Sequence, residues 1–335
     1  MHETVSGVPF NLAEIRVPRL SIATALIAGA ALVLGALPPQ SAPAQAPPGP
    51  CAAAPRAGSA TITLTSGGVK RSAVLHLPPV AAGRAFPLVI ALHGYGDNGA
   101  SFERETGLDT VADRDHFAAL YPSSLGPTWQ INGRPRDVQF ISSLLDTVQS
   151  QACVDPLRIY AMGVSNGGGM AAVLGCELSY RIAAIAPIAG GYRSLPACAP
   201  GRPVSLLEVH GTADTTVPYS GQPSTGAGDV LAYVFGWVFR DGCSQTPIKQ
   251  KVADHALLYR WSGCGGGAVV EHLRIYGGGH GLPGAVSSQI SSGNRTTIDG
   301  IEQVWRFFAP LVLAPAPAPA AAPASGDPDQ PSPSA

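Results

Sequence analysis

Short apolar runs of strand length alternate with helix-compatible segments along most of the chain. Residues 60–77 alternate around a Gly-Gly turn, which predicts an antiparallel hairpin. Six further strands are predicted at 88–92, 118–121, 158–162, 183–188, 205–209 and 272–276, and an apolar-faced closing helix at 298–313. Strands separated by helices pair in parallel. The pattern therefore predicts one α/β domain with a mostly parallel central sheet, helices on both faces and an antiparallel N-terminal hairpin.

The N-terminal segment has the composition of an export signal. Residues 20–37 are apolar, two arginines precede them, and Ala44-Gln-Ala46 follows, which is typical of a signal peptide spanning 1–46. Because the apolar run approaches membrane-spanning length, an uncleaved N-terminal anchor is the alternative. Residues 1–15 hold two acidic residues and no Lys or Arg, so a later translation start at Val17 is a further hypothesis.

The remaining boundaries follow from composition. We expect a linker over 47–59, the catalytic domain over 60–313 and a Pro/Ala-rich tail over 314–335. A tail of that composition buries too little apolar surface to fold, so we expect it to be disordered. The central region is of ordinary size for one α/β domain.

A serine between glycines follows the strand predicted at 158–162. The segment Gly163-Val-Ser-Asn-Gly167 matches a nucleophile elbow, in which the serine occupies a strained strand-to-helix turn and glycines avoid Cβ collisions. The amides at the start of the next helix then point at a developing oxyanion. The pattern indicates Ser165 as a nucleophile, with an oxyanion hole formed by the backbone N–H groups of Tyr95 and Asn166.

A serine nucleophile needs a base and an orienting carboxylate, which follow the serine in the order acid, then histidine, in this type of fold. Asp214 and His280 each come after a predicted strand and a turn, so we predict that they are the carboxylate and the base. Asp229 and Asp241 are alternatives to Asp214. The remaining candidates after strands are His93, His210 and Asp137. Of these, His93 and Asp137 are interpreted as structural, with His93 packing beneath the oxyanion loop.

Charge and cysteine content narrow the function class. Charged residues make up 13% of the chain, the net charge is −1 and no basic block is present, so we expect no nucleic-acid partner. Six cysteines without a Cys-x-x-Cys pair favour disulfides over metal ligands in an exported protein. Of fifteen possible connectivities we expect Cys51–Cys153, Cys176–Cys198 and Cys243–Cys264, with one or two free thiols as the alternative.

Four motifs together resemble a known family: Leu92–Asn98, Gly163–Gly169, His210–Asp214 and Gly277–Pro283. They are similar to the esterase branch of the α/β-hydrolase superfamily that contains feruloyl esterases and polyhydroxybutyrate depolymerases. The resemblance covers residues 61–311. It implies an α/β-hydrolase fold and a secreted serine carboxylic ester hydrolase that uses no metal or organic cofactor.

The resemblance favours a feruloyl-type esterase acting on plant cell-wall esters. A polyhydroxyalkanoate depolymerase is the first alternative, and an acyltransferase or a non-catalytic surface protein is the second. Leu282 stands where relatives often have an aromatic residue, so aromatic acyl recognition is less certain. We expect secretion, with a periplasmic or anchored protein as the lesser possibility, and a monomer without membrane contact after signal cleavage.

Two segments bear on substrate size. The stretch 191–204 is too short for a large lid, so we expect an open site. The segment 218–263 is predicted to flank the pocket, with Tyr219 as a contact; Tyr233 and Trp237 have helical spacing and are alternatively core residues. Trp129 and Leu282 complete the predicted pocket, with loop packing as the alternative for Trp129.

Overall fold

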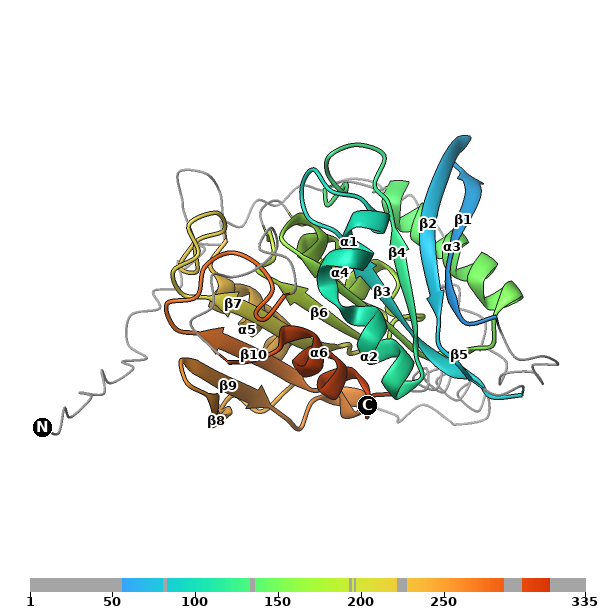
Figure 1. Cartoon of the computed structure of the whole chain (residues 1–335). Coiled ribbons are helices and arrows are strands. Elements are labelled where there is room, and N and C mark those ends of the chain that lie inside the picture. Colours follow the sequence, from blue (N-terminus) through green and yellow to red (C-terminus); the bar gives the residue numbers. More distant parts are fainter. Residues whose placement is uncertain are drawn as a thin grey trace, which may run out of the picture. The chain divides into compact units, whose positions relative to one another are not determined.

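The computed structural model describes residues 56–80, 83–132, 136–192, 195, 197–221, 228–285 and 297–313. All of them lie in one unit of chain, Ala42–Ala335. Among them, ten strands form a single sheet in the order β1-β2-β4-β3-β5-β6-β7-β10-β9-β8 (Figure 1). Their bounds are β1 Gly58–Ser66, β2 Val69–Leu77, β3 Phe86–Leu92, β4 Ala118–Pro122, β5 Val154–Val164, β6 Ala184–Ile188, β7 Ser205–Gly211, β8 Ile248–Ala253, β9 Ala256–Trp261 and β10 Val270–Ile275.

The centre of the sheet is parallel and both of its ends are antiparallel. β4, β3, β5, β6, β7 and β10 pair in parallel, whereas β1 with β2 and β2 with β4 are antiparallel. The predicted N-terminal hairpin and the six further predicted strands are all present. The hairpin of β8 and β9, which pairs antiparallel with β10, is an addition that the sequence pattern did not predict.

Helices cover both faces of this sheet (Figure 1). They are α1 Gly99–Thr106, α2 Leu108–Asp115, α3 Arg136–Gln151, α4 Asn166–Glu177, α5 Val230–Arg240 and α6 Gly300–Phe308, and a short 3-10 turn, η3, spans Gly265–Gly267. Alternate residues of a strand point to opposite faces. On β3, Leu88 and Ile90 accordingly pack in one apolar cluster with α3, α4 and α5, whereas Val89 and Ala91 pack in a second cluster with α1, α2 and α6.

A strand covered by helices on both faces is apolar throughout, which explains why β3 has seven buried residues in succession. The carboxyl ends of parallel strands meet at one edge of a sheet, which is where ligands bind in open α/β folds. The loops after β3, β5, β7 and β10 therefore bring the predicted functional residues to the same edge. Within the described part of the chain, no helix is both long and apolar enough to span a bilayer.

Candidate active site

Ser165 occupies a strained turn between β5 and α4. Its backbone has φ 57° and ψ −119°, outside the regions that residues with a Cβ ordinarily occupy. Hydrogen bonds hold this conformation: the Ser165 N–H donates to Ile188 O at 2.9 Å, and Gly169 N–H and Gly191 N–H each donate to Ser165 O at 3.0 Å. The surrounding backbone thus fixes a half-buried serine at the sheet edge.

The glycines of the elbow are required by close backbone approach. A Cβ on Gly163 would lie 2.3 Å from Gly167 O, and a Cβ on Gly167 would lie 2.1 Å from Leu92 O. Backbone atoms have no flexible end that moves aside, so any side chain at either position would displace α4 from the sheet. The spacing of the Gly-x-Ser-x-Gly motif therefore follows from the packing of β3, β5 and α4.

The loop after β3 lies against the serine. Gly94 is close enough that a Cβ on it would be 3.7 Å from Ser165 Cβ, and the next residue is Tyr95. Asn166 is the first residue of α4, so its backbone N–H is one of the unpaired donors of a helix N-terminus. Tyr95 is 72% exposed, so its side chain is not packed into the site, and its backbone N–H is the part suited to an oxyanion hole. That assignment remains a prediction.

His93 and Trp129 support this loop from below. His93 is fully buried; its Nδ1–H donates to Gly94 O at 2.7 Å, and its Nε2 accepts from Ser124 N–H at 3.1 Å. Burial lowers the pKa of His93, which suits the neutral ring that this hydrogen-bond pattern needs. Trp129 Nε1–H donates to His93 O at 2.9 Å. The structural role expected for His93 agrees with these contacts.

Substituting Trp129 with Phe should reduce kcat without changing KM for a small ester by more than about twofold. The variant removes the hydrogen bond to His93 O, so the oxyanion loop is held less firmly. We expect a loss of about tenfold, less than the hundred- to thousand-fold cost of deleting an oxyanion donor. Steady-state kinetics on p-nitrophenyl acetate measure it. Trp305→Phe on α6 is the matched control, and an equal loss in both variants would contradict the proposed support.

Asp214 and His280 lie in the loops after β7 and β10. His280 Nδ1–H donates to Asp214 Oδ2 at 2.8 Å. The Asp214 side chain is fully buried, and its Oδ1 accepts the backbone N–H groups of Thr216 and Val217 at 2.8 Å each. Burial raises the pKa of Asp214, but the hydrogen bonds from His210 and His280 outweigh this effect and lower it. The His280 side chain is 23% exposed, so its ring reaches the surface.

Among the described residues, none of the other carboxylates that the sequence offered bonds to His280. Asp229 caps α5 by accepting from Ala232 N–H, and Asp241 follows the last residue of the same helix. Asp137 forms a buried ion pair of 2.7 Å with Arg71, which fits the structural role expected for it. Of the candidates, the structure brings Asp214 to His280.

A second histidine and a glutamate stand behind Asp214. His210 Nε2 lies 3.2 Å from Asp214 Oδ2 and 2.9 Å from Val217 O, whereas His210 Nδ1 lies 2.8 Å from Glu208 Oε1. Both nitrogens thus face atoms that only accept hydrogen bonds, which requires the doubly protonated ring. Burial lowers the pKa of His210, but the charge of Glu208 and the bond to Asp214 outweigh it and raise the pKa to about 10.

Glu208 also binds a third histidine. Its Oε2 lies 2.7 Å from His272 Nδ1, and its Oε1 accepts the Tyr192 hydroxyl at 2.9 Å. Burial raises the pKa of Glu208, but its two histidine partners outweigh burial and lower it. Glu208 and His272 are unexposed neighbours on β7 and β10. We call Glu208, His210, His272 and Tyr192 the rear network.

The rear network makes stability depend on pH. The folded pKa of His210 lies above the ordinary value of about 6.5, so its contribution is complete below about pH 6.5 and declines as the pH rises toward about 10. We expect the free energy of unfolding to fall between about pH 6.5 and about pH 8.5, by at most about 1.4 kcal/mol per pH unit. Urea unfolding at a series of pH values measures this free energy. The control variant His255→Asn, at an exposed histidine, should show the same decrease with pH. A flat profile would contradict the charged His210.

Sequence reasoning named His210 but assigned it no role, and it missed Glu208 and His272. The signal was present: Glu208 and His210 are ionisable residues inside a fully covered strand, β7, and His272 is buried on β10. Buried ionisable residues need partners, so two such strands side by side indicate a network. What the sequence lacked was the register that places Glu208 opposite His272.

Two members of the predicted substrate pocket are mainly packing residues. Leu282 is completely buried in the apolar cluster with α6, where a Cβ on Gly300 would meet it at 2.6 Å, so the expectation of a pocket contact is wrong for this residue. Trp129 is 2% exposed, which favours the alternative of loop packing. Both side chains are packed inside the protein and leave almost no surface for a substrate to contact.

Tyr219 is half-buried and bound to the rear network. Its hydroxyl donates to His272 Nε2 at 2.7 Å, in the tautomer whose Nδ1–H donates to Glu208. Tyr233 and Trp237 lie on α5 and line a cavity of about 370 Å³ beside α4; Trp237 is 1% exposed. Trp237 is therefore a core residue, which was the alternative to a pocket contact.

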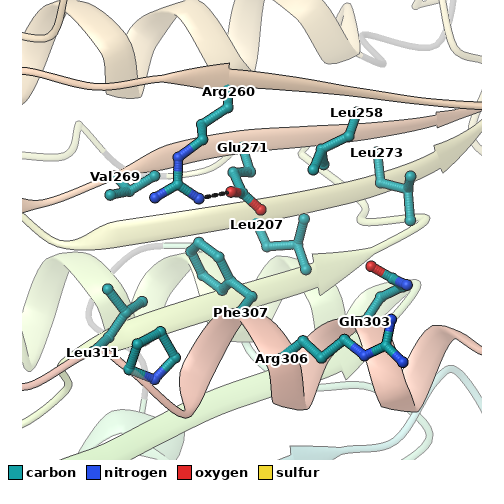
Figure 2. A pocket seen from close by; sticks show the side chains of 11 residues that line it. Leu207, Leu258, Arg260, Val269, Glu271, Leu273, Gln303, Arg306, Phe307 and Leu311 are labelled. Atoms are coloured by element: carbon teal, nitrogen blue, oxygen red, sulfur yellow. Dashed lines mark hydrogen bonds and ion pairs between the residues drawn. The ribbon is translucent and has the colours of Figure 1, made fainter. Parts of the chain in front are cut away.

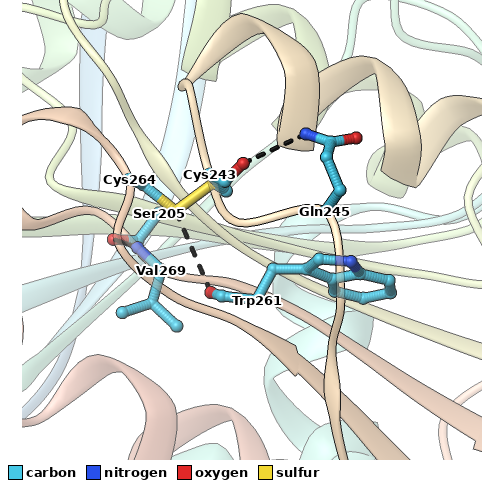
Figure 3. Close-up of a disulfide and its surroundings, with 6 residues drawn as sticks. All are labelled: Ser205, Cys243, Gln245, Trp261, Cys264 and Val269. Atoms are coloured by element: carbon cyan, nitrogen blue, oxygen red, sulfur yellow. Dashed lines mark hydrogen bonds between the residues drawn. A yellow bond between two sulfur atoms is a disulfide. The ribbon is translucent and has the colours of Figure 1, made fainter.

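Disulfides brace the segments that follow β6 and β9. The structure contains Cys176–Cys198 and Cys243–Cys264, the pairs expected from the sequence. Figure 3 shows the second, beside the carbonyl of Trp261 and the side chain of Gln245. Cys153 is also disulfide-bonded, but Cys51, its expected partner, lies outside the described residues. Closing loops of about twenty residues stabilises a fold by about 3 kcal/mol per bridge.

A cavity of about 190 Å³ lies on the opposite face of β10, against α6 (Figure 2). Leu207, Leu273 and Phe307 line it, and Glu271 pairs there with Arg260. Glu271 precedes His272 on the strand and so points away from the rear network. The cavity is therefore separate from the Asp214 side of the sheet.

Comparison with known proteins finds that the chain is similar to esterases. Residues 71–193 match the family model described as "Esterase PHB depolymerase", a range that includes the loop after β3 and the elbow. The solved structure of an acetyl xylan esterase from Aspergillus awamori superposes with a TM-score of 0.55 at 14% identity, covering 75% of this chain and 99% of that one. A thermostable esterase gives a TM-score of 0.53 at 16% identity, covering 76% of this chain and 63% of that one. The predicted α/β-hydrolase fold is confirmed.

Curated relatives have esterase names. Feruloyl esterase B of Piromyces equi is 30% identical, covering 63% of this chain and 42% of the relative. The putative esterase NocK of Nocardia uniformis is 32% identical, with coverages of 61% and 66%, and a bifunctional acetylxylan esterase/xylanase of Neocallimastix patriciarum is 29% identical, with coverages of 58% and 28%. This chain thus spans less than two thirds of the length of each relative. The resemblance to feruloyl esterases and polyhydroxybutyrate depolymerases is confirmed.

Proposed function

From its α/β-hydrolase fold and its similarity to esterases, we propose that the chain is a serine carboxylic ester hydrolase whose catalytic residues are Ser165, His280 and Asp214. The observation that carries this proposal is the 2.8 Å hydrogen bond between His280 and buried Asp214, at the sheet edge that also holds the strained turn of Ser165. A buried carboxylate fixes the tautomer of the base, and a strained elbow projects the nucleophile.

The first half of the reaction forms an acyl-enzyme. Ser165 Oγ attacks the ester carbonyl carbon while His280 Nε2 takes the hydroxyl proton, and Asp214 stays ionised beside His280 Nδ1–H. The backbone N–H groups of Tyr95 and Asn166 hold the negative oxygen of the tetrahedral intermediate. The carbon–oxygen bond to the alcohol then breaks, and His280 returns the proton to the leaving alcohol.

The second half repeats these steps with water. His280 removes a proton from water, the hydroxide attacks the acyl carbon, and the bond to Ser165 Oγ breaks as His280 reprotonates it. The acid product leaves and the serine is restored. The mechanism uses no metal and no organic cofactor.

For the substrate we propose hydroxycinnamoyl esters of plant cell-wall polysaccharides. Relatives named feruloyl esterase B and feruloyl esterase C support this class. The description of the matching family model, "Esterase PHB depolymerase", favours polyhydroxyalkanoate as the second candidate substrate. Transfer of the acyl group to an alcohol other than water would use the same residues and is a third.

Parallel assays on the full chain, with its disulfides formed, separate these candidates. We expect release of ferulate from methyl ferulate and no clearing of a polyhydroxybutyrate suspension. Clearing without ferulate release would select the depolymerase. Transesterified glycerol as the main product in a glycerol-containing assay would select the transferase, and inactivity on all substrates, including p-nitrophenyl acetate, would contradict the esterase itself.

We further propose that the protein acts outside the cytoplasm, as a monomer. The signal-type segment 1–46 lies outside the described residues, so support comes from the disulfides, which persist in oxidising compartments. The predicted linker and the predicted tail also lie outside the described residues, except for 56–59.

A further inference from the structure

Arg274 on β10 is held between two tyrosine rings. Its guanidinium carbon lies 4.9 Å from the ring centroid of Tyr219 and 4.8 Å from that of Tyr276. Its Nε is buried without a hydrogen-bond acceptor, and among the described residues no carboxylate forms an ion pair with it. A guanidinium oriented by stacking while its donors stay unpaired is suited to a planar anion such as a carboxylate.

The same face of the sheet continues this arrangement toward its edge. Lys249 on β8 and Tyr259 on β9 are paired across the hairpin, and the ammonium of Lys249 lies 5.7 Å from the Tyr259 ring centroid. Tyr276 is 38% exposed and Lys249 is exposed, so the arrangement reaches the surface. We call these five residues, Tyr219, Lys249, Tyr259, Arg274 and Tyr276, the cation–tyrosine surface.

Nearby acids are already engaged elsewhere. Asp254 pairs with Lys251 at 2.8 Å, and Glu271 pairs with Arg260 on the opposite face of the sheet (Figure 2). Asp229 caps α5, and Glu208 is buried in the rear network. Lys249, like Arg274, has no ion pair among the described residues. The surface therefore carries two uncompensated positive charges between aromatic rings.

We infer that the cation–tyrosine surface binds a polysaccharide whose sugar units bear carboxylates, as uronic acids do. Tyr276, which is 38% exposed, offers an aromatic surface on which a pyranose ring packs, and the two cations pair with carboxylates. Arg274 and Lys249 lie two strands apart and are offset by two residues along the strands, a separation of about 12 Å. That spacing suits a chain with more than one sugar unit better than a single small acid.

This inference rests on the proposed function and gives its substrate a binding subsite. Tyr219 lies in the loop that follows Asp214, and Tyr276 directly precedes the glycine turn leading to His280. A polysaccharide held on this surface would run beside the proposed catalytic residues. An ester on one of its side branches could then reach Ser165 while the backbone stays bound.

A binding experiment tests the inference without turnover. The Ser165→Ala chain is titrated by calorimetry with glucuronoxylan and with the same polymer after chemical reduction of its carboxyl groups. We expect tighter binding of the charged polymer, with a difference that shrinks as salt rises. Arg274→Met should weaken binding of the charged polymer about tenfold, as loss of charged hydrogen bonds predicts. Lys249→Met, on the exposed edge strand, should weaken binding of the charged polymer several-fold. This variant replaces Arg274→Met in the test if Arg274→Met fails to fold.

The matched control is Arg306→Met on α6, which removes the same charge from the other face of the sheet. It should leave binding unchanged, and an equal loss there would show non-specific attraction and overturn the inference. Equal affinity for the charged and reduced polymers would overturn it as well. The inference would also be overturned if free ferulate, at the same concentration as the carboxylates of the polymer, displaced the polymer. That result would assign the surface to a small acid. None of these results depends on ester hydrolysis, so the proposed function is tested separately.

Discussion

Ser165→Ala should lower kcat on p-nitrophenyl acetate by about 10⁶-fold, since deletion of a triad nucleophile has this effect in serine hydrolases. The hydroxyl oxygen is the atom that forms the acyl bond, and no neighbouring group replaces it. The fold should persist because the backbone hydrogen bonds of the elbow involve only main-chain atoms of residue 165. Burst and steady-state kinetics measure the loss, and circular dichroism verifies the fold.

Ser262→Ala is the control for this variant, because Ser262 is an exposed serine after β9. It should retain full activity. A folded Ser165→Ala protein with activity within tenfold of the unaltered chain would refute Ser165 as nucleophile.

Glu208→Gln should destabilise the fold by about 3–5 kcal/mol, the cost of removing one partner from a buried ion pair. His210 and Tyr192 donate to Oε1, and His272 Nδ1 lies 2.7 Å from Oε2, so either orientation of the amide would place its NH₂ group against a donor. Loss of the carboxylate also removes the charge that keeps His210 protonated against Asp214. We expect kcat to fall by up to about a hundredfold through misplacement of Asp214, with a smaller change in KM.

Glu271→Gln provides the comparison, since Glu271 is the adjacent glutamate on β10. Its partner, Arg260, has a side chain that is 48% exposed and keeps water as a partner, so we expect a loss of no more than about 1 kcal/mol and unchanged kcat. Equal losses of stability and activity in the two variants would contradict a specific role of the rear network. Denaturant unfolding and steady-state kinetics give both readouts.

The elbow was predictable from the sequence because local geometry determines it. Only glycine fits at 163 and 167 against the backbones of β3 and α4, and the sequence has glycine at both positions. The same holds for the positions of the inner strands along the chain, because strands with two covered faces need apolar runs. Asp214 and His280 were predicted from the rule that functional residues lie after parallel strands. Only the structure shows the hydrogen bond between them.

What the sequence did not show depends on contacts between distant segments. The hairpin of β8 and β9 lies at the sheet edge, where exposed lysines dilute the apolar signal that marked the inner strands. Leu282 is adjacent to a functional loop yet points into the cluster with α6, a direction that only the loop's path determines. Glu208 and His272 lie 64 positions apart and meet through strand register.

The central claim is that Ser165 becomes acylated with His280 as its base. Trapping with an alkylphosphonate p-nitrophenyl ester and intact-mass analysis of the phosphonylated protein tests it most directly. We predict one adduct per chain, located on the peptide containing Ser165, absent in Ser165→Ala and formed at least about a hundredfold more slowly in His280→Ala. A stoichiometric adduct on another residue, or labelling at an unchanged rate without His280, would contradict the account.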